Sequence, residues 1–93
     1  MRITLLGAGA WGTALAIAFA GKNEVTLWSR EEDVAVDLRN TRENHRFLPG
    51  HKLPEGVRIE TDFAVAIAGA DLLVIATPIA GLRPTVERLK ALN

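Results

Sequence analysis

Three glycines near the amino terminus carry the clearest chemical signal in this 93-residue sequence. Gly7, Gly9 and Gly12 match the pattern G-x-G-x-x-G, and an apolar run from Ile3 to Leu6 precedes them. Between a strand and a helix, the first glycine permits a tight turn, the second lets the backbone touch a pyrophosphate, and the third lets the helix pack against the strand. The helix start also favours negative charge. We therefore expect a dinucleotide phosphate here; the alternative is a purely structural turn.

The residues that follow the next expected strand bear on which dinucleotide binds. NAD-binding units usually place an acidic residue there to bind the ribose hydroxyl groups, whereas this chain has Ser29 and Arg30. A guanidinium can pair with a 2′-phosphate through two hydrogen bonds, so Arg30 favours NADP over NAD. Two alternatives stay open. Arg30 is a solvated residue of the next helix, or Glu31 or Glu32 supplies the acidic group from a displaced position.

Two further positions flank the expected cofactor cleft. Trp11 lies inside the glycine motif and either lines the cleft or packs on the sheet. Thr77 and Pro78 close the last expected strand at its carboxyl end, where open α/β sheets bind ligands. Pro78 either shapes the wall beside the nicotinamide half of a cofactor or belongs to an ordinary strand-to-helix turn.

The sequence offers no catalytic constellation. Hydride transfer to a ketone needs a proton donor near the substrate oxygen, and the lysines Lys22, Lys52 and Lys90 lie in a turn, a loop and the end of a helix. His45 and His51 fall in the same long loop without the nearby carboxylate ligands that a metal site needs. We therefore predict no catalytic residue and no metal ligand in this chain, and we expect both histidines on the surface.

Composition excludes several classes of function. Eleven basic and eleven acidic residues give zero net charge, so the basic surface that binds nucleic acid is absent. Without cysteine there is no disulfide framework and no thiolate metal site. The glycines interrupt the apolar amino terminus, which argues against a signal peptide and a membrane span.

The remaining pattern supplies the elements that must position these residues. Expected strands cover residues 3–6, 24–28, 57–60 and 72–76, and expected helices cover 11–20, 29–40, 61–68 and 82–92. Ser29 and Glu32 have the spacing of a capping box for the second helix, Thr61 or Asp62 caps the third, and residues 41–56 form a long loop. Alternating strands and helices predict an α/β Rossmann-type doubly wound parallel sheet, the front portion of a larger dinucleotide-binding domain.

At this point the sequence resembles one family. The segments that carry the resemblance are Gly7 to Ala16, Leu27 to Arg30, Asn44-x-x-Phe47-Leu48-Pro49, Ala70-Asp71, Ala76-Thr77-Pro78 and Arg83. Together they are similar to the N-terminal domain of bacterial NAD(P)-dependent glycerol-3-phosphate dehydrogenase, along the whole chain. The family's cofactor contacts map onto Ala10, Trp11 and Arg30. Ala10 stands where the family commonly has serine, so a hydroxyl contact to phosphate is lost there.

The resemblance implies that residues 1–93 are the NAD(P)-binding domain of a cytoplasmic oxidoreductase. That enzyme interconverts sn-glycerol 3-phosphate and dihydroxyacetone phosphate for phospholipid synthesis. Its catalytic lysines and helical substrate domain would lie beyond Asn93, so the chain alone should be inactive. A homodimer of the full-length enzyme stays open. The alternatives are a stand-alone dinucleotide-binding regulatory module and the cofactor domain of another hydroxyacid dehydrogenase.

Overall fold

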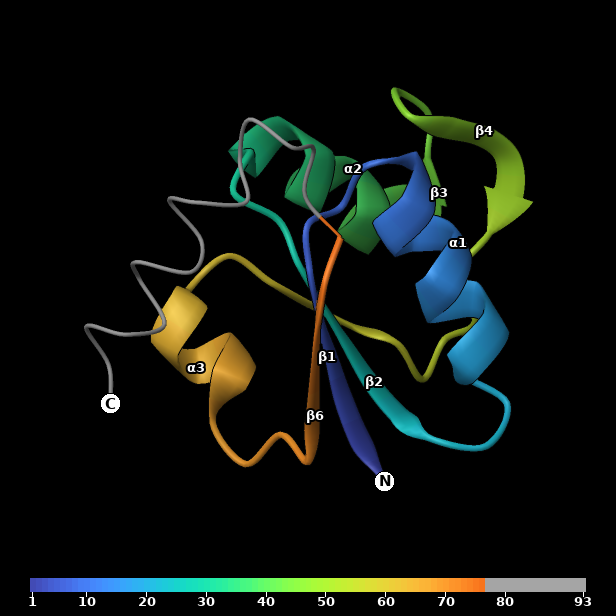
Figure 1. Ribbon diagram of the computed structural model, residues 1–93. Helices are drawn as coiled ribbons and strands as arrows, with labels where there is room; N and C mark the ends of the chain where they lie inside the picture. The colour runs from blue at the N-terminus through green and yellow to red at the C-terminus, as the bar shows by residue number, and fades with distance from the viewer. Residues whose placement is uncertain (77–93) are drawn as a thin grey trace.

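The computed structural model describes residues 1–76, so the expected final helix and the Thr77-Pro78 turn lie outside the described residues. Strands and helices alternate along most of this part of the chain (Figure 1). In chain order, the elements are β1 (Arg2–Leu6), α1 (Ala10–Phe19), β2 (Glu24–Trp28), α2 (Glu32–Thr41), β3 (Glu43–Asn44), β4 (Leu48–Lys52), β5 (Arg58–Glu60), α3 (Phe63–Ile67) and β6 (Leu72–Ile75).

Four of the strands form one parallel sheet in the order β5-β2-β1-β6. The central strand β1 pairs with β2 on one side and with β6 on the other, and Leu5 lies opposite Leu27 and Val74. The chain therefore builds outward from β1 through β2 and β5, and then crosses back to place β6 on the far side of β1. This reversal confirms the Rossmann-type doubly wound fold and creates a switch point between β1 and β6.

Each face of the sheet has its own apolar core, because alternate residues of a strand point to opposite faces. Ile3, Leu5, Val25 and Leu27 point to the face that α1 and α2 cover, where they pack with Val34, Ala35 and Leu38. Leu6 and Trp28 point to the other face, where α3 packs through Phe63 and Ala66. The Trp28 and Phe63 rings meet edge to face, with centroids 5.0 Å apart. Figure 1 shows α1 and α3 on opposite sides of the sheet.

The second helix begins later than the sequence predicts. The backbone N–H of Ser29 donates to the carbonyl of Glu60 on β5 (2.9 Å), which holds Ser29 beside the end of that strand. Its hydroxyl bonds to the backbone of Glu31 rather than to a helix amide three residues on. The capping box expected at Ser29 and Glu32 is therefore wrong, and Glu31 is the residue that precedes α2. The expected cap at Asp62 is confirmed, because its side chain accepts from the N–H of Val65.

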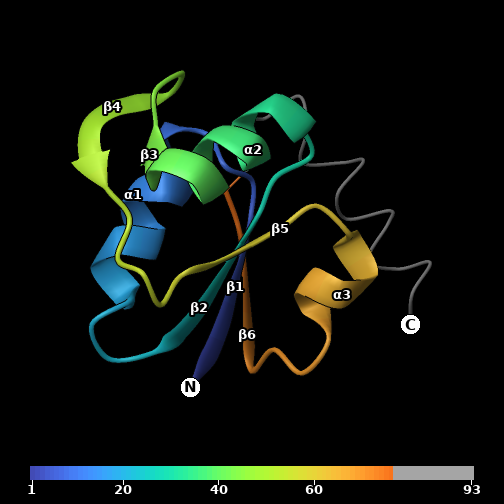
Figure 2. The ribbon, with the colours of Figure 1, turned by 180° about the vertical axis from the view of Figure 1, so that it is seen from behind.

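Residues 41–56 are not a simple loop. They contain an antiparallel hairpin of β3 and β4, which lies against α1 and α2 (Figure 2). Arg42 ends α2 in the left-handed conformation, with φ of 60°. The carboxylate of Glu43 then accepts a hydrogen bond from the N–H of Gly50 and closes the hairpin. We refer to residues 43–52 as the hairpin below.

Candidate functional site

The glycine turn lies at the carboxyl end of the central strand. Gly7 follows β1 directly and has a φ of 127°, which side chains disfavour. Its N–H donates to the carbonyl of Trp28 at the end of β2 (3.1 Å), so the turn leaves the sheet beside the end of the neighbouring strand. Gly9 then precedes α1 with φ of −77°. The turn therefore lies beside the switch point, where open α/β sheets bind ligands.

Gly9 and Gly12 have different surroundings. A Cβ on Gly12 would lie 1.7 Å from the carbonyl oxygen of Gly7 and 3.4 Å from the Cβ of Ala76. Glycine is required there because α1 presses against the end of β1. A Cβ on Gly9 would meet nothing within 4 Å. The protein itself therefore does not require glycine at position 9, and the open space above its backbone fits an approaching ligand.

The start of α1 is suited to an anion. The N–H of Thr13 donates to Gly9 and makes the first bond of the helix, so the amides of residues 10, 11 and 12 have no partner within the helix. No side chain caps α1, and its first turn holds no acidic residue. The helix dipole adds partial positive charge at this point. The geometry and the charge both fit a pyrophosphate.

Asn44 is a positioning residue for this turn that the motif analysis did not assign. Its side chain is fully buried, and its Nδ2 donates to the carbonyl of Ala8 (2.7 Å) and to the hydroxyl of Thr13 (2.8 Å). Its Oδ1 accepts from the N–H of Phe47 (3.1 Å). Asn44 therefore ties the glycine turn and α1 to the hairpin. These partners lie 31 and 36 residues away in the chain, so no local spacing reveals them.

The predicted cofactor residues that the structure describes lie around the turn. Ala10 and Trp11 occupy the first turn of α1 and are exposed. Trp11 is 75% exposed, so it does not pack on the sheet. Arg30 is exposed and follows β2, whose carboxyl end pairs with that of β1. Pro78 lies outside the described residues.

Glu31 is an alternative to Arg30 as the group that contacts the ribose, and its carboxylate is already engaged. Arg46 of the hairpin donates from Nη1 to Oε2 of Glu31 and lies 3.4 Å from a carboxylate oxygen of Asp33. Glu31 is therefore neutralised by a basic side chain. This pairing weakens the interpretation of Glu31 as the acidic residue of an NAD site.

The outer side of the hairpin carries a second charged group of residues. His45 is exposed, as expected, but two carboxylates flank it: Nδ1 lies 2.9 Å from Asp37 and Nε2 lies 3.1 Å from Glu43. The backbone N–H of His45 also donates to Asp37, and this bond lowers the pKa of the Asp37 carboxyl. The bond from Gly50 N–H lowers the pKa of Glu43 in the same way. Within residues 1–76, no group of three or more histidine and acidic side chains is arranged to hold a metal.

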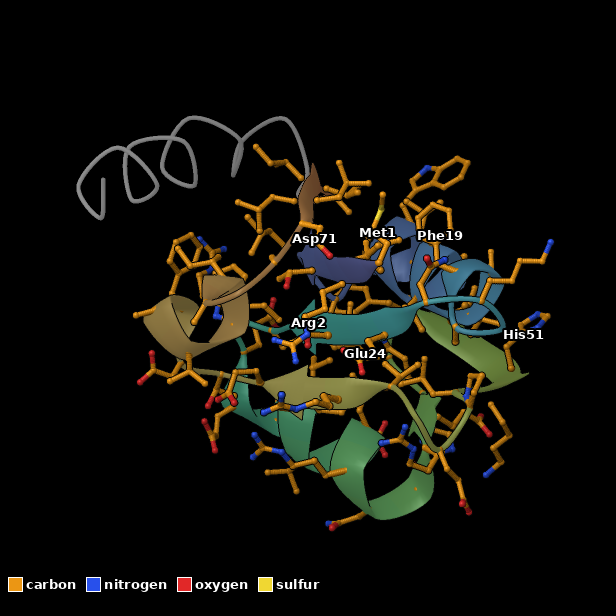
Figure 3. The ribbon with its side chains drawn as sticks, turned by 90° about the horizontal axis from the view of Figure 1, so that it is seen from below. Met1, Arg2, Phe19, Glu24, His51 and Asp71 are labelled. Atoms are coloured by element: carbon orange, nitrogen blue, oxygen red, sulfur yellow. The ribbon has the colours of Figure 1, made fainter. Side chains whose placement is uncertain are left out.

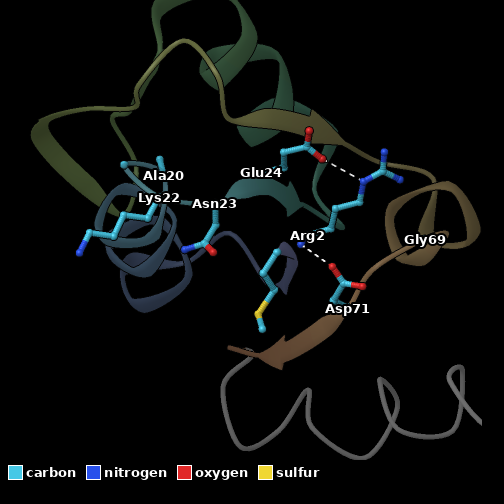
Figure 4. Close-up of a pocket in the computed structure, with 9 residues that line it drawn as sticks. Arg2, Ala20, Lys22, Asn23, Glu24, Gly69 and Asp71 are labelled. Atoms are coloured by element: carbon cyan, nitrogen blue, oxygen red, sulfur yellow. Dashed lines mark hydrogen bonds and ion pairs between the residues drawn. The ribbon is translucent and has the colours of Figure 1, made fainter.

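An open hollow of about 830 Å³ lies at the opposite end of the strands (Figure 4). Arg2, Lys22, Glu24 and Asp71 line it. Arg2 pairs with Glu24 at 2.9 Å and donates through its backbone N–H to Asp71 at 2.8 Å, as the dashed lines in Figure 4 mark. Figure 3 labels Arg2, Glu24 and Asp71 in the view from below. The Arg2 and Glu24 side chains are largely exposed. Because the hollow lies at the amino ends of parallel strands and lacks the G-x-G-x-x-G turn between a strand and a helix, we do not assign the cofactor to it.

The two lysines in the described part of the chain, Lys22 and Lys52, lie away from the glycine turn. Lys22 lines the hollow at the amino ends of the strands, as expected. Lys52 donates to the carbonyl of Thr41 and lies 3.7 Å from Glu43. Lys90 lies outside the described residues. No helix within residues 1–76 is long and apolar enough to cross a membrane.

The parallel sheet, with its glycine turn between central strand and helix, defines a Rossmann-type α/β domain, the class in which such turns carry dinucleotides. A family model described as "NAD-dependent glycerol-3-phosphate dehydrogenase N-terminus" matches residues 2–93. The chain therefore belongs to this family.

Individual relatives agree with this assignment. Over 93 residues the chain is 78% identical to a glycerol-3-phosphate dehydrogenase (NAD(P)+) of Dechloromonas aromatica, with all of the chain and 28% of the relative covered. It is 48% identical to the protein of the same name from Paucimonas lemoignei, with 97% of the chain and 28% of the relative covered. A crystal structure of glycerol-3-phosphate dehydrogenase from Coxiella burnetii superimposes with a TM-score of 0.90 at 34% identity, over 97% of this chain and 28% of that one. The chain thus spans about 28% of the length of these relatives.

Proposed function

We propose that this chain is the cofactor-binding part of an NAD(P)-dependent glycerol-3-phosphate dehydrogenase. The observation that carries the proposal is the contrast within the glycine motif. Gly12 is required by the packing of the protein itself, whereas Gly9 leaves open space beside the unpaired amides of α1. A pyrophosphate that lies on Gly9 would explain why a residue without a side chain stands there.

The residues of this chain would bind and orient the cofactor. Amides of residues 10–12 hold the pyrophosphate, Asn44 keeps the turn in shape, and the exposed Trp11 contacts the cofactor from the first turn of α1. From its place after the last expected strand in the sequence, Pro78 is the residue proposed to contact the nicotinamide half. When bound, the nicotinamide ring of the cofactor supplies or accepts the hydride. The names of the relatives, which include NAD(P)+, support use of both NAD and NADP.

The reaction of the whole enzyme is the interconversion of sn-glycerol 3-phosphate and dihydroxyacetone phosphate, which supplies the backbone of glycerophospholipids in the cytoplasm. We place the catalytic residues and the helical substrate domain in the part of the relatives' length that this chain does not span, because the chain covers 28% of that length and Lys22 and Lys52 have no suitable position. The purified chain should bind the cofactor and show no dehydrogenase activity. The family assignment does not favour a stand-alone regulatory module or another hydroxyacid dehydrogenase.

NADP is the preferred cofactor in this proposal, because Arg30 follows β2 where NAD-binding units place an acidic residue. A direct test compares NADPH and NADH binding to the chain and to Arg30→Ala. The exposed Arg58 at the start of β5 provides the control Arg58→Ala, which makes the same change of charge elsewhere. Arg30→Ala should weaken NADPH binding about tenfold or more and leave NADH binding within about twofold. An equal effect on both cofactors would remove Arg30 from this role.

A further inference from the structure

Three consecutive residues of the hairpin attach it to three parts of the proposed cofactor site. Asn44 binds the glycine turn, His45 binds Asp37 in the middle of α2, and Arg46 binds Glu31 and Asp33 at the start of α2. The Arg46 contact differs from the other two, because it brings a full positive charge to the residues that follow Arg30.

Three acidic residues follow Arg30 in the sequence. Glu31, Glu32 and Asp33 follow it directly, at the residue before α2 and in its first turn. This position suits the helix dipole. A 2′-phosphate bound at Arg30 carries nearly two negative charges, however, and these three acidic residues add up to three more negative charges near it.

Arg46 offsets this repulsion. Its Nη1 contacts the carboxylates of both Glu31 and Asp33, and its guanidinium carbon lies 4.9 Å from the centroid of the Phe47 ring. Two carboxylates and an aromatic face therefore hold the guanidinium beside the residues that follow Arg30. The Arg46 side chain is 55% exposed, so its removal should not disturb the core.

We infer that Arg46 is a specificity-determining residue for the cofactor: by neutralising Glu31 and Asp33, it permits the 2′-phosphate of NADP to bind at Arg30. This inference rests on the proposed function of Arg30. Without Arg46, the freed carboxylates repel the phosphate, and Glu31 becomes available to accept a hydrogen bond from the ribose hydroxyl of NAD. Arg46 therefore acts through its acidic partners and not through contact with the phosphate.

The test is a double-mutant cycle that compares four forms of the protein: the wild type, Arg46→Gln, Glu31→Gln and the double variant. The dissociation constants of NADPH and NADH are measured for each at low salt. Arg46→Gln should weaken NADPH binding about three- to tenfold and leave NADH binding unchanged or tighter. The double variant should recover the NADPH-to-NADH ratio of the wild type to within about twofold. At 1 M salt the Debye length is only about 3 Å, so the repulsion between the carboxylates and the phosphate is screened. The loss of NADPH affinity in Arg46→Gln should therefore be smaller.

Lys52→Gln is the matched control, because Lys52 is a cation of the same hairpin that pairs with Glu43 instead. It should leave the NADPH-to-NADH ratio unchanged. If Arg46→Gln weakens both cofactors equally, Arg46 only supports the hairpin and the inference is wrong. If the double variant stays as weak as Arg46→Gln, Arg46 contacts the phosphate itself and the proposed neutralisation is also wrong.

Arg30→Ala, measured beside this cycle, separates the inference from the proposal on which it rests. A selective loss of NADPH binding in Arg30→Ala, with no selective loss in Arg46→Gln, overturns only the role of Arg46. If Arg30→Ala loses no selectivity, the 2′-phosphate does not bind at Arg30, and the inference fails with the proposal.

Discussion

Adding one methyl group to each of two glycines of the same turn should produce two different defects. Gly12→Ala would place a Cβ 1.7 Å from the carbonyl oxygen of Gly7, a contact with rigid backbone. The two atoms must separate by at least about 1.3 Å to reach 3.0 Å, so α1 must move away from β1. Gly9→Ala would place its Cβ in open space, at a φ of −77° that alanine adopts readily.

The expected magnitudes follow from these geometries. Forcing an extra carbon into a packed site costs about 1–3 kcal/mol or more, and the better helix propensity of alanine returns up to about 1 kcal/mol. The net loss for Gly12→Ala is therefore about 1–2 kcal/mol or more, which lowers the Tm of a domain of this size by about 5–15 °C. Gly9→Ala should lower the free energy of unfolding by a few tenths of a kcal/mol, because alanine is less favourable than glycine at the position before a helix. Its methyl group instead occupies the space proposed for the pyrophosphate, and NADPH affinity should fall at least about tenfold.

The assay is a thermal melt of each variant without ligand, followed by NADPH titration of those that melt cooperatively. Gly56→Ala serves as the control, because a Cβ there also meets nothing within 4 Å and Gly56 lies outside the turn. It should melt and bind like the wild type. Equal melting temperatures for Gly12→Ala and Gly9→Ala would refute the close packing of α1 on β1. Unchanged NADPH affinity in Gly9→Ala would refute the assignment of the pyrophosphate to this turn.

Two further predictions concern the hairpin. Asn44→Ala leaves the carbonyl of Ala8 and the hydroxyl of Thr13 without their buried donor, so we expect a loss of about 1–3 kcal/mol in the free energy of unfolding. NADPH affinity should also fall, and it should fall more than the affinity for 2′-AMP, which has no pyrophosphate; equal losses for both ligands in titrations would contradict a role at the turn. The second prediction is a pH dependence, because the N–H and ring of His45 lower the pKa of Asp37. Because the pKa of Asp37 is lower in the folded state, its ionised carboxylate stabilises the fold at pH values above the ordinary pKa of 3.8. This stabilisation is lost as the pH falls through the lowered pKa. In melts between pH 5 and 2.5, Asp37→Asn should therefore lose less Tm than the wild type, and parallel curves would show that Asp37 contributes nothing.

The sheet and the glycine turn could be predicted from the sequence because their signals are local. After Arg2, β1 is a buried run of branched residues, and β6 is a run of branched apolar residues that lies partly exposed at the edge of the described sheet. Such short runs predict strands of a parallel sheet. In the structure β1 begins at Arg2, one residue before the predicted run. The glycine spacing identified the turn because two of its requirements are local: Gly7 has a positive φ, and Gly12 lies against the carbonyl of Gly7, five residues before it. The Asp62 cap was predicted for the same reason, since its partner Val65 lies three residues away.

The features that the sequence did not reveal depend on contacts between distant residues. The expected cap at Ser29 failed because Glu60, 31 positions later, holds the Ser29 backbone beside β5. The hairpin was missed because Pro49 and Gly50 interrupt any strand-like alternation within β4. The positioning role of Asn44 and the pairing of Arg46 with Glu31 follow from that hairpin, so they could not be predicted before it was known.

The most direct test of the central claim is to follow the backbone amides of the isotopically labelled chain by NMR during a titration with NADPH. If the glycine turn holds the pyrophosphate, saturable shifts should concentrate at residues 9–12, because the amides of residues 10–12 have no partner within the helix and would bind the phosphates. The amides around the hollow at the other end of the sheet, such as Lys22 and Gly69, should stay unchanged. Saturable shifts around that hollow, with residues 9–12 unaffected, would contradict the account.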